Sequence, residues 1–503
     1  MLPLDPEIVT GPVVTDPARP GTRPRALLVS TNRERSPQPC VPNGPAAVAA
    51  SLVRSGWAVS ALDLCFVREP DRALREAIRS ERPDAVAFSV RNLDNSDLVA
   101  TEHYVPAARR LVAVARGETT VPLVGGGAAF GVAPAGLVSA LDLDAGVAGD
   151  GELVAPRVLE AAAGGRAGIE LPGVAWRGAS RITPPAPPAD LDALPAPEPW
   201  RWADLRRYQR HGATVPVQTK RGCVFGCVYC TYLNVEGKGY RLRSPAAVVD
   251  EVRALSRHGV RRVDFVDSTF NSPLHHAVAV AEALARVHTG VSLDTTNFTP
   301  AVASPELFAA MRRAGFRWLG ITAESASDPV LDQLRKGFDV ARLHACAARA
   351  EAAGIRVLWI FLAGGPGETP DTLDETLRFA AGRLARGDAA YLTVGLRVYP
   401  GTVLQSIAEA EGQVAPGDPL LAPRFYLSPA LPLERALERL REFAAREPRF
   451  MFSADSRNPA MPRLVRLASL LGLPRPHWRY LSLFRRLAGA PPIASFPGRR
   501  QTE

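Results

Sequence analysis

Short apolar runs alternate with amphipathic segments along most of the chain, and this rhythm predicts an α/β fold. In the first third, strands that are apolar on both faces are separated by helix-like stretches such as residues 46–55. Such strands are typical of a doubly wound, flavodoxin-like parallel sheet, in which the ligand loops follow the carboxyl ends of the strands. The predicted strands are Ala26–Ser30, Ala58–Leu62, Ala85–Val90, Val121–Val124 and Ala145–Ala148.

A second β/α series follows a proline-rich stretch and predicts a separate sheet. Repeated strand–helix units are typical of a partial, TIM-like (β/α)6 barrel, whose chemistry sits on the loops that follow the strands. After about residue 402 this rhythm gives way to arginine-rich amphipathic helices. The predicted barrel strands are 215–219, 262–266, 291–296, 318–323, 356–363 and 391–398, and the predicted C-terminal helices are 433–446, 462–473 and 477–487.

These patterns divide the chain into five parts. Residues 1–22 are expected to form a disordered tail and residues 166–212 a surface linker, because both stretches are rich in proline. The first α/β domain then covers residues 23–165 and the barrel covers residues 213–405. Residues 406–503 make a small, mainly helical C-terminal region.

Composition and charge narrow the class of protein. A chain of 503 residues with 47% hydrophobic residues is typical of a soluble protein of two or three domains. Its apolar runs are too short to span a membrane and its first residues do not resemble a signal peptide, so we expect a cytoplasmic protein. The net charge of +9 comes mainly from dispersed arginines, without a run of five basic residues, so we expect no nucleic-acid partner.

Three cysteines fall within eight residues, in the order Cys223, Cys227 and Cys230. Three thiolates on one short loop can hold three irons of a four-iron cluster and leave the fourth iron open to a ligand. An odd number of cysteines argues against a disulfide framework, and the usual pairs of zinc ligands are absent. The alternative is three structural cysteines that fall at this spacing by chance.

This CxxxCxxC run resembles the signature of the radical S-adenosylmethionine (SAM) enzymes, with Tyr229 in the aromatic position before the last cysteine. The resemblance implies a 4Fe-4S cluster held by the three cysteines, with the amino and carboxylate groups of SAM on the open iron. It also implies an external electron donor, such as flavodoxin or ferredoxin. One electron would then split SAM to give a 5′-deoxyadenosyl radical.

The first domain resembles the cobalamin-binding domain of the B12-dependent radical SAM family. Three loops after predicted strands carry this likeness: residues 89–95, the glycine run 125–127, and the Gly-Asp-Gly-Glu turn 149–152. The resemblance implies that these loops bind cobalamin. The residues expected to contact it are Arg91, Asn92, Asp94, Gly125, Gly126, Gly149, Gly151 and Glu152.

One feature departs from other cobalamin-binding domains. The loop of residues 31–43 contains no histidine, so the lower face of the cobalt must meet another group. Arg91 is one candidate, because a permanent cation would not ligate cobalt and would disfavour positive charge there. Alternatively, Arg91 pairs with Asp94. A nucleotide-binding domain or an empty sheet also stays possible for this half, although neither a Gly-x-Gly-x-x-Gly helix start nor a phosphate loop is present.

Polar residues follow the second and fourth barrel strands, where the family binds SAM. Asp267, Ser268 and Thr269 stand where related enzymes bind the SAM amino group, and they can accept its hydrogen bonds. Glu324 and Ser325 are expected to contact the ribose hydroxyls. Ser325 alternatively caps the next helix.

The fifth and sixth barrel strands end in two further candidate loops. Gly365, Gly367 and Glu368 belong to a Gly-Gly-Pro-Gly-Glu-Thr run that resembles the family's loop near adenine and methionine. Arg397 points into the barrel in one alternation register, where it can bind the SAM carboxylate or an acidic substrate group. Tyr399 lies on the same face and is a candidate substrate contact or proton donor. Core packing is the alternative for both side chains.

The resemblance, over about residues 25–405, implies a cobalamin-dependent radical SAM C-methyltransferase. It would act on an unactivated carbon of a small molecule in secondary-metabolite, for example antibiotic, biosynthesis, with methylcobalamin as the methyl carrier. The first alternative is a B12-dependent radical SAM enzyme that catalyses a rearrangement or cyclisation without methyl transfer. The second is a cluster-bearing sensor or scaffold that does not turn over. The sequence does not distinguish radical from polar methyl transfer.

Overall fold

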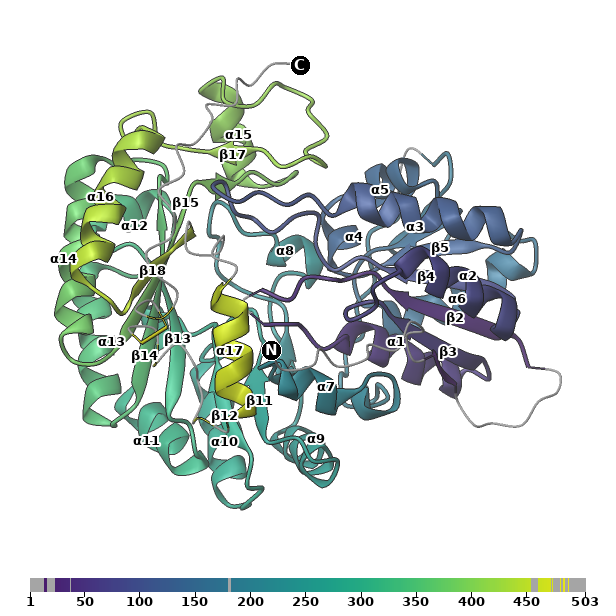
Figure 1. The fold of residues 1–503 in the computed structure, drawn as a ribbon, viewed down its shortest axis with the longest axis horizontal. Coiled ribbons are helices and arrows are strands. Elements are labelled where there is room, and N and C mark those ends of the chain that lie inside the picture. The colour runs from purple at the N-terminus through teal and green to yellow at the C-terminus, as the bar shows by residue number, and fades with distance from the viewer. Residues whose placement is uncertain are drawn as a thin grey trace.

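The protein folds into two α/β units that lie side by side, with the C-terminal segments above and in front of the space between them (Figure 1). The computed structural model describes residues 13–15, 23–36, 38–179, 182–453 and 460–471, together with residues 473, 480, 483, 484 and 487. No helix within these ranges is long and apolar enough to cross a membrane.

The first unit is a seven-stranded sheet in the order β1-β3-β2-β4-β5-β6-β7, in which the five middle strands are parallel. Alternate residues of one strand face opposite cores: Leu27 and Val29 pack under α2, α3 and α5, whereas Ala26 and Leu28 pack under α1 and α6. This explains why the strands read as continuous apolar runs. The strands are β1 (Val13–Thr15), β2 (Arg25–Ser30), β3 (Ala58–Asp63), β4 (Ala85–Ser89), β5 (Leu123–Gly126), β6 (Ala145–Val147) and β7 (Val174–Trp176). The helices are α1 (Asn43–Arg54), α2 (Pro70–Glu81), α3 (Val105–Glu118), α4 (Ala128–Val132), α5 (Pro134–Leu141) and α6 (Gly151–Ala163).

Both edges of this sheet correct the predicted boundaries. β1 pairs antiparallel with β3, so residues 13–15 belong to the sheet and not to a disordered tail; the rest of residues 1–22 lies outside the described residues. β7 pairs antiparallel with β6 inside the stretch predicted to be a linker. Trp176 of β7 is buried, and its indole N–H donates to the Ile169 carbonyl (2.8 Å). The first domain therefore extends past residue 165.

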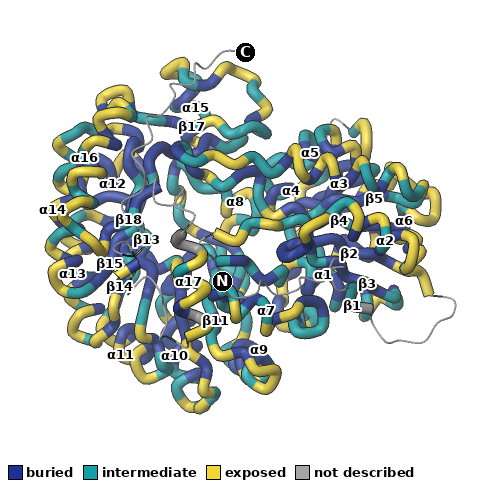
Figure 2. The backbone as a smooth tube through the Cα atoms, in the orientation of Figure 1, coloured by how far each residue is buried: buried dark blue, intermediate teal, exposed yellow. Residues whose placement is uncertain are grey.

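The second unit is a partial barrel of two parallel sheets, β12-β11-β8 and β13-β14-β15-β18. Two isolated bridges, Leu293 to Phe316 and Phe298 to Ile321, join the sheets. Figure 2 shows buried strands inside a ring of helices whose outer faces are exposed. The strands are β8 (Val215–Val217), β11 (Arg262–Phe265), β12 (Ser292–Thr295), β13 (Trp318–Glu324), β14 (Arg356–Ala363), β15 (Ala389–Val394) and β18 (Phe450–Phe452). The helices are α9 (Pro245–Arg257), α10 (Leu274–Ala285), α11 (Pro305–Ala314), α12 (Asp328–Gln333), α13 (Val340–Ala352) and α14 (Pro370–Leu384).

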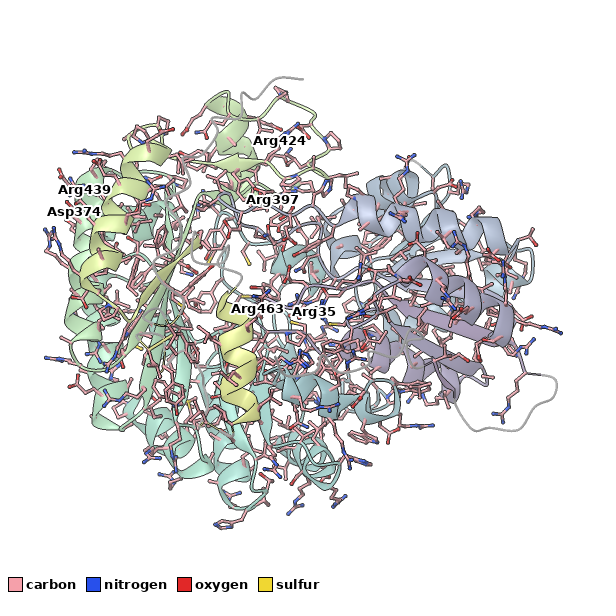
Figure 3. All side chains as sticks on the ribbon, in the orientation of Figure 1. Arg35, Asp374, Arg397, Arg424, Arg439 and Arg463 are labelled. Carbon is pink, nitrogen blue, oxygen red and sulfur yellow. The ribbon has the colours of Figure 1, made fainter. Side chains whose placement is uncertain are left out.

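The predicted fold class is confirmed, with one addition from the C-terminal region. β18 pairs parallel with β15 and extends the barrel, although the region was predicted to be mainly helical. The predicted helix 433–446 is α16 (Leu433–Arg446), which the Arg439–Asp374 ion pair (2.5 Å) joins to α14 (Figure 3). The next predicted helix is α17 (Ala460–Leu470), which contacts α7 (Leu205–Arg210), and the predicted helix 477–487 lies almost wholly outside the described residues.

Candidate cofactor site

The cysteine loop follows the first barrel strand and begins in a two-stranded ribbon, β9 (Lys220–Arg221) with β10 (Arg241–Leu242). Cys223 is buried, and Cys227 and Cys230 are half-buried. Gly222 has a φ of +90°, and a Cβ there would lie 1.9 Å from the Gly239 carbonyl oxygen. Only glycine therefore allows this close crossing of two backbone segments at the start of the loop.

The three thiols fit a four-iron cluster better than a single metal ion. Among the described residues, no three His, Cys, Asp or Glu side chains converge closely enough to hold one ion. A four-iron cluster allows its ligands to lie farther apart than one ion does, because each thiolate binds a different iron. Burial raises the pKa of Cys230 to about 12, so its thiolate form requires a neighbouring positive charge. Cluster iron would supply that charge.

A buried network connects the cysteine loop to the end of β13. The Tyr229 hydroxyl donates to the Glu324 carboxylate (2.7 Å), and the Lys336 ammonium donates to both Glu324 (3.2 Å) and the Tyr229 oxygen (3.2 Å). Glu324 and Lys336 are only 5% and 6% exposed. The structure thus places Glu324 beside the cysteine motif, where one of its oxygens accepts from protein donors, whereas the prediction was a contact with the SAM ribose hydroxyls. Lys336 was not predicted.

A second buried ion pair corrects the role expected of Asp267. Its carboxylate accepts hydrogen bonds from the Thr219 hydroxyl (2.6 Å) and the Lys220 ammonium (3.0 Å), and both charged side chains are fully buried. Asp267 is therefore committed to the protein and not available to the SAM amino group. Ser268 is also engaged, because its hydroxyl donates to the Gly222 carbonyl (2.6 Å). The Thr269 hydroxyl oxygen lies 4.0 Å from the Cys223 sulfur.

Ser325 and Glu368 are buried at the carboxyl ends of the next strands. The Ser325 hydroxyl accepts the Ser327 N–H (3.2 Å) and lies 3.1 Å from the Thr376 hydroxyl oxygen, so it bonds the residue that precedes α12 and does not cap that helix. One Glu368 oxygen accepts the N–H groups of Gly364 and Gly365, while the other has no partner. Burial raises the pKa of Glu368 to about 7. Its carboxyl closes a glycine loop in which Gly367 has a φ of +77°.

The predicted cobalamin loops line a cavity of about 260 Å³ at the carboxyl edge of the first sheet. Gly127 has a φ of +100°, and a Cβ there would lie 2.5 Å from the Val90 carbonyl oxygen, so the loop after β5 requires glycine. Apolar side chains and glycine backbone dominate the walls, as expected for a pocket that receives an organic cofactor. The predicted residues that line the cavity are Gly125, Gly126, Gly149, Gly151 and Glu152, and the barrel adds Gln218, Arg221, Val235 and Glu236.

Arg221, which lies two residues before Cys223, forms ion pairs with residues in the wall of this cavity. Its guanidinium bonds Asp150 and Glu152 (2.5 Å to Glu152), both in the Gly-Asp-Gly-Glu turn of the first domain. Arg241 donates to the same Asp150 (2.7 Å). Glu236, another wall residue, accepts the Gly222 N–H (3.0 Å) one position before Cys223. Residues in contact with the cysteine loop therefore form one wall of the cavity.

A second clamp joins the two units and corrects the role predicted for Arg397. The Arg397 guanidinium is buried between the units (Figure 3), where it donates to Asp94 (2.7 Å) and to the Leu420 carbonyl (2.8 Å). The Tyr399 hydroxyl oxygen lies 2.8 Å from the Ser96 hydroxyl oxygen. Arg397 and Asp94 are thus bound to each other and not aimed at SAM, substrate or cobalamin.

Arg91 is not paired with Asp94, since Asp94 bonds Arg397. It is exposed and, with Asn92, lines a second cavity of about 660 Å³ on the α2 and α3 side of the same sheet edge. The structure brings together the cysteines, Tyr229, Glu324 and Thr269 at the barrel mouth. The glycine loops and Glu152 line the smaller cavity, next to the barrel mouth. Arg91 and Asn92 line the larger cavity.

Comparisons with known proteins agree with this arrangement. Residues 30–159 match the B12 binding domain, and residues 217–380 match the Radical SAM superfamily. A tryptophan 2-C-methyltransferase of Streptomyces laurentii is 28% identical over 440 residues, 74% of this chain and 72% of the relative. A hopanoid C-3 methylase of Methylococcus capsulatus is 28% identical over 331 residues, 63% of this chain and 59% of the relative.

The fold is also similar to a solved structure. The radical SAM methyltransferase TsrM of Kitasatospora setae, with cobalamin and a [4Fe-4S] cluster bound, gives a TM-score of 0.80 at 24% identity. The match covers 93% of this chain and 99% of that one. A further structure of the same protein contains its tryptophan substrate and a SAM analogue.

The chain thus combines a B12-binding domain with a radical SAM domain that follows it. This combination confirms the predicted family and the predicted cofactors: a 4Fe-4S cluster and SAM in the barrel, and cobalamin in the first domain. The glycine cradle, the shared cavity wall and the three thiols are the features of this chain that fit those groups.

Proposed function

We propose that this enzyme transfers a methyl group from SAM, by way of cobalamin, to a carbon atom of a small molecule in secondary metabolism. The observation that carries the proposal is the wall shared by the cobalamin-type cavity and the cysteine loop, formed by Arg221 and Glu236. Methyl transfer requires both cofactors at one substrate, and a shared wall brings their sites together. The names of the two relatives, both C-methylating enzymes, support the same reaction class.

The residues of this chain supply position and charge, and the bound groups supply the reactive chemistry. When bound, the cluster provides an electron for SAM cleavage and cobalamin provides a methyl carrier. Arg221 and Arg397 hold the two units in register through Glu152 and Asp94. Electrons would come from an external flavodoxin or ferredoxin.

Arg91 is our candidate for the group that would face the lower side of cobalt. Ser89 lines the cobalamin-type cavity and Arg91, two residues later, lines the adjoining cavity of about 660 Å³, so a cobalamin that extends across this edge of the sheet would reach both. Arg91 is exposed, and its expected partner Asp94 bonds Arg397 instead. A guanidinium does not ligate cobalt and disfavours positive charge nearby. Electron paramagnetic resonance of the Co(II) protein should therefore lack nitrogen splitting from a lower ligand, and observed splitting would contradict this assignment.

The test uses enzyme reconstituted without oxygen with iron, sulfide and cobalamin, and SAM labelled in its methyl group. Tryptophan is the first substrate to try, followed by other aromatic amino acids and indoles. A product that carries the labelled methyl on carbon supports the proposal. An altered product without the label would instead indicate a rearrangement or cyclisation.

A further inference from the structure

The Lys336–Glu324 pair contacts the cysteine motif through the hydroxyl group of Tyr229. Tyr229 lies between Cys227 and Cys230 in sequence, and its hydroxyl bonds both members of the pair. The ammonium also lies 5.8 Å from the centre of the Tyr229 ring. This arrangement places two opposite charges, neither exposed to bulk water, directly beside the cluster-binding loop.

The backbone at Glu324 is arranged to reach this position. Glu324 has a φ of +63°, in the left-handed region that side chains other than glycine rarely occupy, and a register shift in the β13–β14 pairing lies between Thr322 and Glu324. Such conformations persist where the surroundings fix them, often at functional sites. Here the bonds to Tyr229 and Lys336 do so.

Lysine is rare in this protein, which makes its placement informative. The chain contains only three lysines among its 60 basic Lys and Arg residues. Two of the three, Lys220 and Lys336, are buried and bond residues of the cysteine loop or the residues that brace it. A compact ammonium can approach a carboxylate and a phenol together where a planar guanidinium needs more room.

We propose that Lys336 and Glu324 are positioning residues that set the reduction potential of the iron–sulfur cluster and hold its loop through Tyr229. Reduction of the cluster adds one negative charge to the site. In a region shielded from water, a nearby cation favours the reduced state and a nearby carboxylate disfavours it. The proposal depends on the cluster and not on methyl transfer, so the failure of one leaves the other standing.

The opposed charges give predictions of opposite sign. Lys336→Met leaves the Glu324 carboxylate unpaired beside the cluster, so the midpoint potential should become more negative. Glu324→Gln leaves the ammonium unpaired, so the potential should become more positive. The double variant should return close to the wild-type value. Tyr229→Phe, which removes the shared hydroxyl but no charge, should shift the potential less than either single charge variant.

The measurement is a redox titration of reconstituted full-length protein at pH 8, followed by electron paramagnetic resonance of the reduced cluster. Arg383→Met is the matched control: it breaks a buried pair with Asp388 (2.9 Å) at the amino-terminal end of the barrel strands, and should leave the potential unchanged. Shifts of the same sign in Lys336→Met and Glu324→Gln, or no shift in either, would overturn the proposal. If Lys336→Met does not hold a cluster, Glu324→Gln decides alone: a positive shift supports the proposal and any other result rejects it.

Discussion

Two kinds of side chain surround the predicted cluster site. The three cysteines are expected to bind iron, and neighbouring polar groups form hydrogen bonds that hold the cysteine loop. Cys223, Cys227 and Cys230 are the only cysteines on the loop after β8, whereas Cys346 is buried in α13. Asp267 was predicted to bind SAM from the sequence, but its carboxylate pairs with Lys220 in the interior. The distinction depends on which polar groups already have protein partners.

Cys227→Ala should abolish cluster assembly, because the remaining two thiolates cannot hold three irons. Iron and acid-labile sulfide, measured after anaerobic reconstitution, should fall to background, and 5′-deoxyadenosine formation should stop. Cobalamin binding should persist, since no cysteine lines the cobalamin cavity. Cys346→Ala is the control and should keep its cluster. Normal iron and sulfide in Cys227→Ala would show that this thiol is not a ligand.

Glu368 predicts a dependence of stability on pH. Its pKa is raised by burial from 4.5 to about 7, so the folded state binds a proton more tightly than the unfolded state does. Stability from this group is present below pH 4.5 and decreases as the pH rises through 7. Relative to Glu368→Gln, which cannot ionise, the wild-type protein should lose about 2 kcal/mol between pH 5 and pH 8. Urea unfolding of the two proteins at both values checks this, and parallel pH profiles would refute it.

At the scale of elements, two arginines of the barrel unit form ion pairs with carboxylates of the first domain. Arg397, from β16 (Leu396–Arg397), bonds Asp94, and Arg221, from β9, bonds Glu152 in the first turn of α6. Both contacts are shielded from water, which distinguishes them from the exposed pairs on α2. Their geometry shows that two separate loops hold the units together.

Arg397→Met should strongly destabilise the contact between the units. It leaves the fully buried Asp94 carboxylate without its cation, and breaking a buried pair in this way costs about 3–5 kcal/mol. Arg72→Met removes an exposed pair with Glu76 on α2, where solvent screens the charges, and should leave stability nearly unchanged. Thermal unfolding and limited proteolysis of both variants provide the comparison. Equal stability of the two variants would mean that the Arg397 clamp contributes little.

For the whole molecule, the cobalamin-type cavity is built from both units. The cobalamin-type cavity lies on the first sheet, yet Gln218, Arg221 and Glu236 of the barrel close it. Glu236 then contacts the backbone of the cysteine loop at Gly222. Glu236 therefore contacts both the cavity and the loop that carries the cysteines.

Arg221→Gln should weaken cobalamin binding about tenfold, because the wall loses its bonds to Asp150 and Glu152. Equilibrium titration of the cobalamin-free protein with hydroxocobalamin measures the change. Arg253→Gln, an exposed arginine of α9 that lies 3.6 Å from Asp250, is the control and should bind as the wild type does. Unchanged affinity in Arg221→Gln would show that the barrel wall is dispensable.

The sequence by itself determined the two α/β units and the order of their strands along the chain, and it identified the three cysteines that are expected to bind the cluster. These follow from local information: the period of apolar residues, the glycines that tight turns require, and a ligand spacing contained in eight residues. The partners of Asp94, Arg397, Asp267 and Glu324, and the relevance of Lys336, were decided only by tertiary structure. Their contacts join residues 12 to 303 positions apart, so no local pattern reports which charge neutralises which. The same holds for β1, β7 and β18, short strands whose existence depends on the sheet edge that each one meets.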